Sequence, residues 1–181
     1  MKKLITCAMI MIATNSIAQK IYTKNGNISF FSKSPLENIT ADNNQVMSVL
    51  NTQTGEMQFS VLVKGFHFEK ALMQEHFNEN YMESEKYPKS TFKGNLADVS
   101  KVNFKKDGTY PVSVIGDLSI HGVTNKVSVP GTITVKGGNI TSNAKFTVRL
   151  ADYKISVPKV VRDNIAENIE ITVACRYDQK M

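Results

Sequence analysis

The 181-residue sequence has no tryptophan and only two cysteines, Cys7 and Cys175. Cys7 lies in an apolar segment at the very start of the chain, so Cys175 has no intramolecular partner once that segment is removed. This excludes a small fold held together by disulfides, and a packed core must stabilise the chain instead. The length is sufficient for one domain of ordinary size with such a core.

The sequence also lacks the helical span expected of a membrane anchor. The apolar stretch Leu4–Ala13 has only about ten residues, whereas a spanning helix needs roughly 20. Two lysines precede it, and Ser16-Ile17-Ala18 follows with small residues where a signal peptidase reads the chain. We therefore predict a signal peptide over residues 1–18 and a mature domain over residues 19–181, exported to the periplasm or secreted. No cysteine directly follows the apolar stretch, so a lipid anchor is not expected.

Neither sign of charge dominates the sequence. The formal net charge is +6, and loss of the two lysines in the signal peptide leaves +4. Lysine and arginine are scattered, and the densest cluster in the mature chain is the pair Lys105-Lys106. This pattern does not favour a nucleic-acid partner, which requires a basic patch or stripe. It is compatible with transient contact with an anionic membrane surface.

Catalytic and metal-binding patterns are missing as well. His67 and His76 lie nine residues apart, on nearly opposite sides of an expected helix, and there is no H-E-x-x-H, cysteine pair, EF-hand loop or G-x-S-x-G. His121 stands beside Gly122 at the junction of a strand and a turn. There it either makes a hydrogen bond within the turn or meets a polar head group at the mouth of a barrel. We expect neither an enzyme nor a bound metal or cofactor.

The sequence is rich in segments where apolar and polar residues alternate. Alternation of period two is typical of a strand with one buried face and one solvent face. The clearest segments are Met57–Val63, Val112–Ile120, Val127–Val135, Phe146–Leu150 and Ile169–Cys175. Further strands are expected at Ile21–Lys24, Asn27–Phe31, Val46–Asn51 and Ser90–Leu96.

Turn signals recur at short spacing between these strands. They are Asn25-Gly26, Thr54-Gly55, Asp107-Gly108, His121-Gly122 and Gly137-Gly138. About eight antiparallel strands with one apolar face must fold over themselves or close into a barrel. A closed barrel of this size is filled by side chains or holds one small ligand. Gly116 and Gly131 lie on apolar strand faces, where they either leave room for a ligand or mark a bend or bulge.

One helix is expected, over Phe68–Met82. Its apolar stripe comprises Leu72, Met73, His76, Phe77 and Met82. The chain becomes extended again before Pro88, because proline disfavours helical geometry in the residue that precedes it. The stripe either packs as ordinary core or closes one end of a cavity, with Phe77 and Tyr81 at that end.

Three passages resemble the YceI-like family of polyisoprenoid-binding proteins. They are His76–Phe92 with its Lys86-Tyr87-Pro88, Gly116–Val127 with its His121-Gly122-Val123-Thr124, and Ala151–Ile155. The resemblance implies an all-β fold: a closed, antiparallel, eight-stranded lipocalin-like barrel with one attached α-helix. It also implies a cavity for an isoprenoid lipid, such as a polyprenyl phosphate or an isoprenoid quinone, and no catalytic residues. Lys154 departs from the family pattern, since many members have glycine there, and this leaves the cavity shape near the late strands open.

The candidate lipid-binding residues come from two sources. Strand alternation points Phe59, Val61, Val114, Leu118, Phe146 and Val148 into the barrel, although each is equally compatible with plain core. The helix and the segment after it supply Phe77, Tyr81, Tyr87 and Phe92, and His121 lies at the expected rim.

Two other interpretations remain at this point. One is a structural or surface interaction module with a filled core and no ligand. The other is a barrel embedded in an outer membrane, which the missing tryptophan and the absence of aromatic girdles disfavour.

Overall fold

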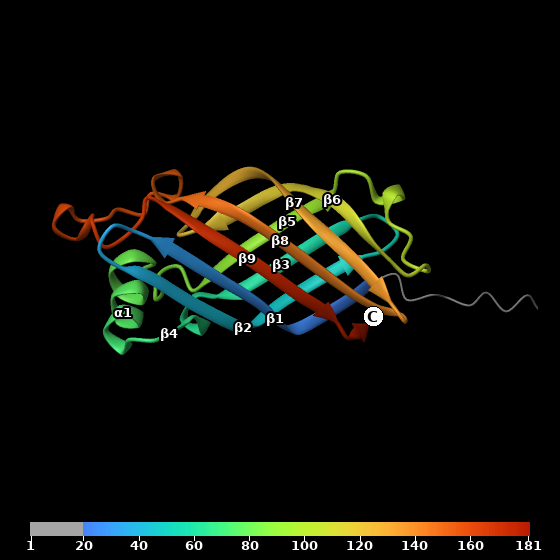
Figure 1. Ribbon diagram of the computed structural model, residues 1–181, viewed down its shortest axis with the longest axis horizontal. Coiled ribbons are helices and arrows are strands. Elements are labelled where there is room, and N and C mark those ends of the chain that lie inside the picture. The colour runs from blue at the N-terminus through green and yellow to red at the C-terminus, as the bar shows by residue number, and fades with distance from the viewer. Residues whose placement is uncertain (1–19) are drawn as a thin grey trace, which may run out of the picture.

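The computed structural model describes residues 20–181, so the predicted signal peptide and its cleavage site lie outside the described residues. Eight strands pair in the cyclic order β1-β2-β3-β5-β6-β7-β8-β9, and the barrel closes because β1 pairs with both β2 and β9. All of these pairings are antiparallel, and the barrel is elongated (Figure 1). The predicted all-β, eight-stranded lipocalin-like barrel is therefore confirmed. Its strands are β1 (Lys20–Lys33), β2 (Asn38–Asn51), β3 (Glu56–Leu62), β5 (Lys89–Leu96), β6 (Gly108–Ile120), β7 (Val123–Lys136), β8 (Asn139–Arg149) and β9 (Asn168–Tyr177).

Two short strands pair with strands of the barrel beyond its main ladders. β4 (His67–Phe68) pairs with β2 at Ala41 and Asp42, and β10 (Gln179–Lys180) pairs with the start of β1. Short 3-10 turns lie in the connections, at Val63–Gly65, Val99–Lys101, Leu150–Tyr153 and Lys159–Val161.

The expected turn at Asn25-Gly26 is wrong, because β1 runs through it as one 14-residue strand. Its pairing with β2 shifts register on both sides of Gly26, which is the signature of a bulge. A Cβ on Gly26 would lie 2.6 Å from the Cys175 sulfur and 3.1 Å from the Val46 carbonyl. Glycine is therefore needed here for close approach of the strands, and the two predicted strands Ile21–Lys24 and Asn27–Phe31 are one.

The helix is shorter than expected and changes type along its length. α1 covers only Ala71–His76, and a π-helical turn continues it from Phe77 to Tyr81. Phe68 belongs to β4 instead, where its backbone pairs with Ala41. Leu72 was expected on the buried stripe but is 61% exposed. No helix within residues 20–181 is both long and apolar enough to cross a membrane.

The largest packed cluster of the interior lies at the end of the barrel opposite α1 (Figure 1). The connection from β5 to β6 covers that end and packs Val99, Val102 and Phe104 against Leu50 and Tyr177. α1 and the connection from β8 to β9 lie at the opposite end (Figure 1). The barrel is thus packed at the end covered by the connection from β5 to β6. The half of the interior nearest α1 has room for a binding site.

The ladder between β7 and β8 is incomplete. It joins Gly131–Lys136 to Asn139–Ala144, and there it stops. Toward the α1 end, β7 remains paired with β6 as far as Val123, and β8 remains paired with β9 as far as Arg149. The ladders between β2 and β3 and between β1 and β9 are also shorter than their strands, but β4 pairs with β2 and β10 pairs with β1 elsewhere along these strands.

Candidate functional site

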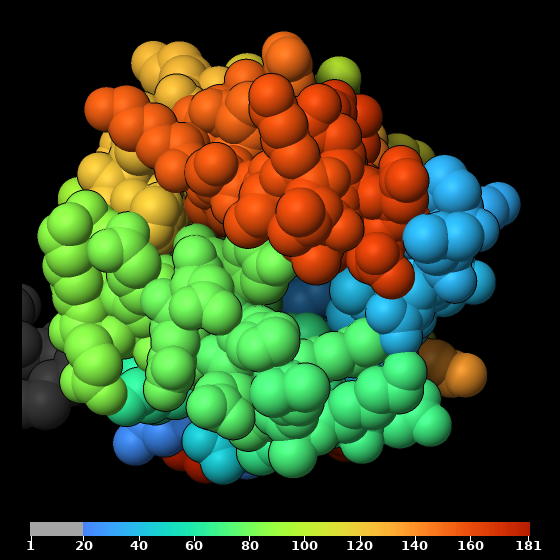
Figure 2. All heavy atoms as spheres, turned by 90° about the vertical axis from the view of Figure 1, so that its left-hand side faces the viewer, coloured from blue at the N-terminus to red at the C-terminus, as the bar shows by residue number. Residues whose placement is uncertain are grey.

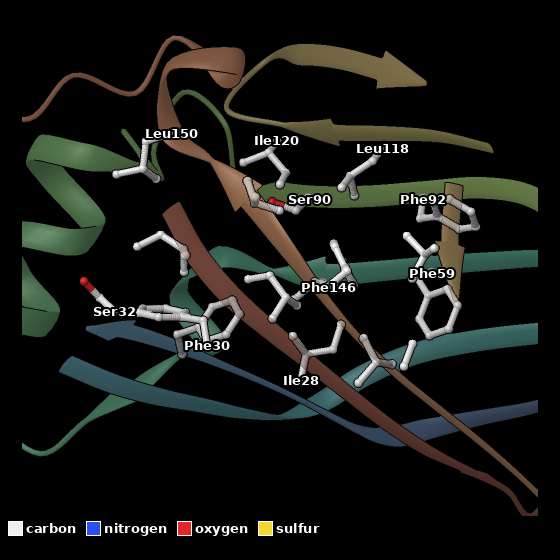
Figure 3. Close-up of a pocket in the computed structure, with 18 of the residues that line it drawn as sticks. Ile28, Phe30, Ser32, Phe59, Ser90, Phe92, Leu118, Ile120, Phe146 and Leu150 are labelled. Atoms are coloured by element: carbon white, nitrogen blue, oxygen red, sulfur yellow. The ribbon is translucent and has the colours of Figure 1, made fainter. Parts of the chain in front are cut away.

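A large apolar cavity occupies the half of the barrel nearest α1. Its volume is about 460 Å³, within the range of roughly 300–1,000 Å³ typical of small-molecule sites. Figure 3 shows side chains from several strands converging on this space, among them Ile28, Phe59, Leu118 and Phe146. The lining is formed mainly by aliphatic and aromatic side chains, so the cavity suits an apolar molecule.

The cavity opens between three segments at the α1 end. Figure 2 shows a hollow framed by the α1 segment, the turn from β1 to β2, and the connection from β8 to β9. Ser32, Glu37, His76 and Asn164 are the polar residues that line this mouth. Further polar residues of the lining, among them Ser90, Thr132 and Ser142, lie on the strands, so polar groups are present along the barrel as well as at the mouth.

Polar bridges hold the mouth segments together. The Lys70 ammonium donates to the Glu37 carboxylate at 2.7 Å, and this hydrogen bond, aided by the charge of Glu37, raises the pKa of Lys70. The Leu36 N–H donates to the Asp163 carbonyl at 3.2 Å, and the Ala166 N–H donates to the Ser32 hydroxyl at 2.9 Å. The turn from β1 to β2 is therefore tied to both of the other segments.

Four phenylalanines form the wall beneath α1. The ring centroids of Phe30, Phe66 and Phe68 lie 5.0–5.6 Å from that of Phe77. The Phe30–Phe77 pair is stacked and the other two pairs are tilted or edge-on. Ring pairs of these kinds add about 0.5–1.5 kcal/mol each beyond the burial of their area. The cluster anchors the helical segment to β1 and to the β4 region, so Phe77 both lines the cavity and fixes the element that covers it.

Gly116 does not enlarge the cavity. A Cβ there would lie 2.4 Å from the Lys93 carbonyl and 2.7 Å from the tip of the Phe92 ring. Gly94, on the neighbouring strand, is crowded by the same ring at 2.6 Å. The two glycines thus let β5 and β6 approach closely with Phe92 lying across them. The interpretation of Gly116 as room for a ligand is therefore wrong, and the register on both sides of Gly116 is regular, so the alternative of a bulge does not hold either.

Nine of the eleven candidate residues line the cavity. They are Phe59, Val61, Phe77, Tyr81, Phe92, Val114, Leu118, Phe146 and Val148. Strand alternation placed most of them correctly, because each strand has one clear apolar face. Their part in binding a lipid stays a prediction. Burial raises the pKa of Tyr81, whose ring belongs to the π-helical turn.

Tyr87 and His121 lie outside the cavity. The two rings pack edge-on with centroids 4.7 Å apart. His121 Nε2 is 2.7 Å from a Glu83 carboxylate oxygen, and Nδ1 is 3.3 Å from the Tyr153 carbonyl oxygen. These contacts connect the segment after the helix to the turn from β6 to β7. The His121 ring therefore bonds to other segments and not within its own turn, and it does not line the cavity.

Sequence reasoning missed the contribution of β1 and of the region around β4. Ile28, Phe30, Phe66 and Phe68 all line the cavity. Phe30-Phe31 interrupts strict alternation, and Phe66 and Phe68 lie where a connection or a helix was expected. Alternation between Ile28 and Phe30 was the one available signal.

Lys154 retains the backbone that glycine would favour. Its φ of 56° and ψ of 28° place it in the left-handed region, where it ends the 3-10 turn Leu150–Tyr153. The Lys154 N–H donates to the Ala151 carbonyl at 3.1 Å. Lys154 therefore adopts the left-handed backbone that glycine would favour, although lysine does so at some cost.

A cluster of three buried hydroxyl groups lies at the end of the cavity farthest from α1. The Tyr177 hydroxyl lies 3.0 Å from the Ser48 hydroxyl and 3.2 Å from that of Ser142, which also lines the cavity. Burial raises the pKa of Tyr177 to about 12, and burial likewise raises that of the Cys175 thiol to about 12. A thiol held neutral in this way is a poor nucleophile.

The described residues offer no metal-binding cluster. Within residues 20–181, no group of three histidine, cysteine, aspartate or glutamate side chains is arranged to hold an ion.

Comparison with known proteins agrees with this architecture. A model of the YceI-like domain matches residues 16–177. The chain is similar in structure to a polyisoprenoid binding domain from Saccharophagus degradans implicated in plant cell wall breakdown, with a TM-score of 0.76, 13% identity, and coverage of 89% of this chain and 98% of that one. Burkholderia cenocepacia BcnA gives a TM-score of 0.64 at 16% identity, covering 83% and 95% of the two chains. The YceI protein of Campylobacter jejuni gives 0.57 at 14% identity, covering all of both chains. A search of curated proteins found no match.

A closed antiparallel barrel with an apolar interior, open at one end, defines the lipocalin-like class. Within that class the chain belongs to the YceI-like family, since the domain match spans nearly all of the described barrel.

Proposed function

We propose that this protein is a non-catalytic carrier that holds an isoprenoid lipid, either a polyprenyl phosphate or an isoprenoid quinone, in the barrel cavity. The observation that carries the proposal is the apolar cavity of about 460 Å³, which lies where a filled core would otherwise be. A structural or surface module with a filled core would not need this space. Membership of the YceI-like family and the polyisoprenoid-binding neighbour from Saccharophagus degradans support the same proposal.

Export is part of the proposal. It is supported by the two lysines, the apolar stretch and the small residues at positions 16 and 18. Fractionation of the native host, with intact-mass analysis, tests it. The expected product is a periplasmic or secreted chain that begins at Gln19, and a cytoplasmic full-length chain would contradict it.

The test of ligand binding starts from the native protein purified without detergent. Mass spectrometry of an organic extract is expected to show a stoichiometric isoprenoid, which names its head group and chain length. Val114→Asp places a charge on the cavity wall, where burial of an unpaired carboxylate is strongly unfavourable, so ligand should be lost. Ile115→Asp is the matched control, because Ile115 is the next residue of β6 and is 45% exposed on the outer face.

Two outcomes would contradict the proposal. One is an empty extract from a well-folded wild-type protein that also fails to bind added isoprenoids. The other is ligand retention by a folded Val114→Asp variant, which would show that the ligand lies elsewhere.

We propose that the protein loads its ligand at the mouth by transient contact with a bilayer. Val160, Leu36 and Leu72 are 91%, 71% and 61% exposed, the highest values among large apolar side chains of residues 20–181. Each belongs to a different one of the three segments that frame the mouth, and Lys159 and Arg162 flank Val160. Exposed apolar side chains of this kind mark membrane or protein contacts.

Vesicles of phosphatidylethanolamine and phosphatidylglycerol that contain a fluorescent isoprenoid test the rim. Replacing Leu36, Leu72 and Val160 by serine should slow ligand uptake from the vesicles several-fold without changing the affinity for ligand in solution. Serine at Met47 and Ile115, which are exposed away from these segments, is the control. Equal uptake by both variants would remove the membrane from the proposal.

A further inference from the structure

The missing part of the β7–β8 ladder leaves a gap in the barrel wall. On the side of the gap farther from α1, β7 and β8 lie close together, since a Cβ on Gly131 would lie 2.7 Å from the Asn143 carbonyl oxygen. Pro130 stands at the point where the ladder ends and has no N–H to continue it. On the side of the gap nearer α1, the Asn125 side-chain amide donates to the Asp152 carbonyl at 2.8 Å and bridges from β7 to the 3-10 turn after β8. The gap between these two limits is called the β7–β8 window below.

The window is long enough to admit part of a ligand. Five residue steps separate Asn125 from Pro130, which at about 3.4 Å per residue is roughly 17 Å of strand. The ladder gives no partner to the backbone groups of β7 and β8 that face each other across this distance. Such groups are obligatory hydrogen-bonding sites, and they require water or a ligand.

The window leads into the cavity. A second hollow of about 540 Å³ lies at the window. Five inward-facing residues line both this hollow and the main cavity: Leu118, Val127, Val129, Phe146 and Val148. The same hollow is lined on its outer side by residues from β7 and β8 that face solvent, including Ser128 and Thr147. The two faces of the wall therefore meet at the window, and an apolar chain in the barrel can end there.

The charges at the window favour an anion. Lys126 and Arg149 line it, and no ion pair engages Lys126 within residues 20–181. Asp152 is the one carboxylate of the lining, and it lies 4.0 Å from the Arg149 guanidinium. The mouth carries charges of both signs: Glu37 is paired with Lys70, the adjoining helical segment carries Glu69, Glu75 and Glu79, and the connection from β8 to β9 carries Lys159 and Arg162.

We propose that the β7–β8 window binds the anionic head of an amphiphilic ligand whose apolar chain lies in the cavity. This inference rests on the proposed carrier function and selects a phosphate-bearing isoprenoid over a neutral one. Lys126 and Arg149 bind the head electrostatically, and the unladdered backbone N–H groups supply donors at the same place. Charged hydrogen bonds to an anion are about twice as strong as neutral ones.

Two probes with the same chain test the head site by calorimetric titration. They are farnesyl monophosphate and farnesol. In Lys126→Glu/Arg149→Glu, the dissociation constant for farnesyl monophosphate should rise at least about tenfold, while that for farnesol changes less than about twofold. Lys89→Glu/Lys93→Glu is the matched control, since it makes the same change in net charge on the exposed face of β5, two strands away. This control should leave both constants within about twofold of the wild type.

The outcomes separate this inference from the proposed function. Equal weakening of both probes, or none, in the window variant overturns the head site. If the wild type binds farnesol but does not bind farnesyl monophosphate, the head site is overturned and the carrier function remains. Failure of the wild type to bind either probe overturns the carrier function and the head site together.

A reversible closure of the window gives a second, independent test. Extension of the β7–β8 register would place Ser128 opposite Thr147, so a reducible crosslinker joined to both thiols of Ser128→Cys/Thr147→Cys should span the gap and obstruct the window. Crosslinking should weaken farnesyl monophosphate binding at least about tenfold, and a reductant should restore it. Thr134→Cys/Thr141→Cys, within the existing ladder, is the control, and its farnesyl monophosphate binding should change with neither crosslinking nor reduction. Unchanged binding by the crosslinked window variant would contradict the proposal.

Discussion

At the scale of single residues, Lys154 shows how one unfavourable conformation preserves a site. Its left-handed backbone ends the turn that carries Tyr153, and Tyr153 packs against the cavity wall near Val148 and Ile155. The Tyr153 carbonyl oxygen lies 3.3 Å from His121 Nδ1, and burial raises the pKa of the Tyr153 hydroxyl. The turn is therefore held by its surroundings, and lysine adopts the required backbone in spite of its side chain.

Replacing Lys154 with glycine should stabilise the protein. A left-handed non-glycine residue costs about 1–2 kcal/mol, and the greater freedom of glycine in the unfolded chain offsets part of that gain. The expected increase in the free energy of unfolding is about 0.5–1 kcal/mol by urea denaturation. Lys136→Gly, within β7, should destabilise instead, because glycine weakens a strand. A loss of stability in Lys154→Gly would contradict the prediction.

Tyr177 should make stability depend on pH in the alkaline range. Burial raises its pKa from 10.0 to about 12, so between these values the folded chain keeps a proton that the unfolded chain has lost. This contribution is fully present below pH 10 and is lost as the pH rises toward 12, at about 1.4 kcal/mol per pH unit. Tyr177→Phe should remove that part of the slope, measured by urea denaturation between pH 8 and 11.5.

The comparison at pH 8 separates this effect from a general loss of stability. Tyr177→Phe leaves the hydroxyls of Ser48 and Ser142 without their shared partner, so the variant should be less stable at every pH. If wild type and variant lose stability in parallel above pH 10, the titration of Tyr177 is not the cause.

At the scale of elements, β7 and β8 each combine two environments in one strand. In the halves of β7 and β8 farther from α1, the two strands pair with each other. In the halves nearer α1 they border the window, while β7 still pairs with β6 and β8 still pairs with β9. Proline at position 130 is compatible with this arrangement, because a strand edge tolerates a residue that cannot donate. The split is thus a feature of strand pairing, and each strand is regular in itself.

Hydrogen exchange should reveal this division. Amides of residues 125–129 and 145–149 that face the window should exchange faster than those of 131–136 and 139–144, which face a partner strand. Alternate amides of residues 145–149 point to β9 and serve as the internal control. Addition of farnesyl monophosphate should slow the window amides selectively. Uniform protection along β8 in the free protein would contradict an open window.

At the scale of the whole molecule, alternation predicts an antiparallel all-β domain because most strands have one apolar face, and the resemblance to the YceI-like family predicts that the sheet closes into an eight-stranded barrel. Alternation locates the core of most strands and most of the lining. It fails at Gly26, where a bulge has the composition of a turn, and at Phe68, whose pairing with Ala41 takes it out of the helix. The window is not visible in the sequence, since its lining residues alternate like any others. Only the pairing of strands distant in the chain determines where a wall is closed.

The packed end of the barrel has a consequence for divergence among related proteins. The packed residues around Leu50 and Tyr177 join several strands at one end of the barrel, away from most of the cavity lining. On the proposed carrier function, substitutions confined to the cavity lining can change which ligand fits while this packed end persists. Structural neighbours at 13–16% identity that keep a similar fold are compatible with such a division. The proposed ligand preference can therefore diverge without a change of architecture.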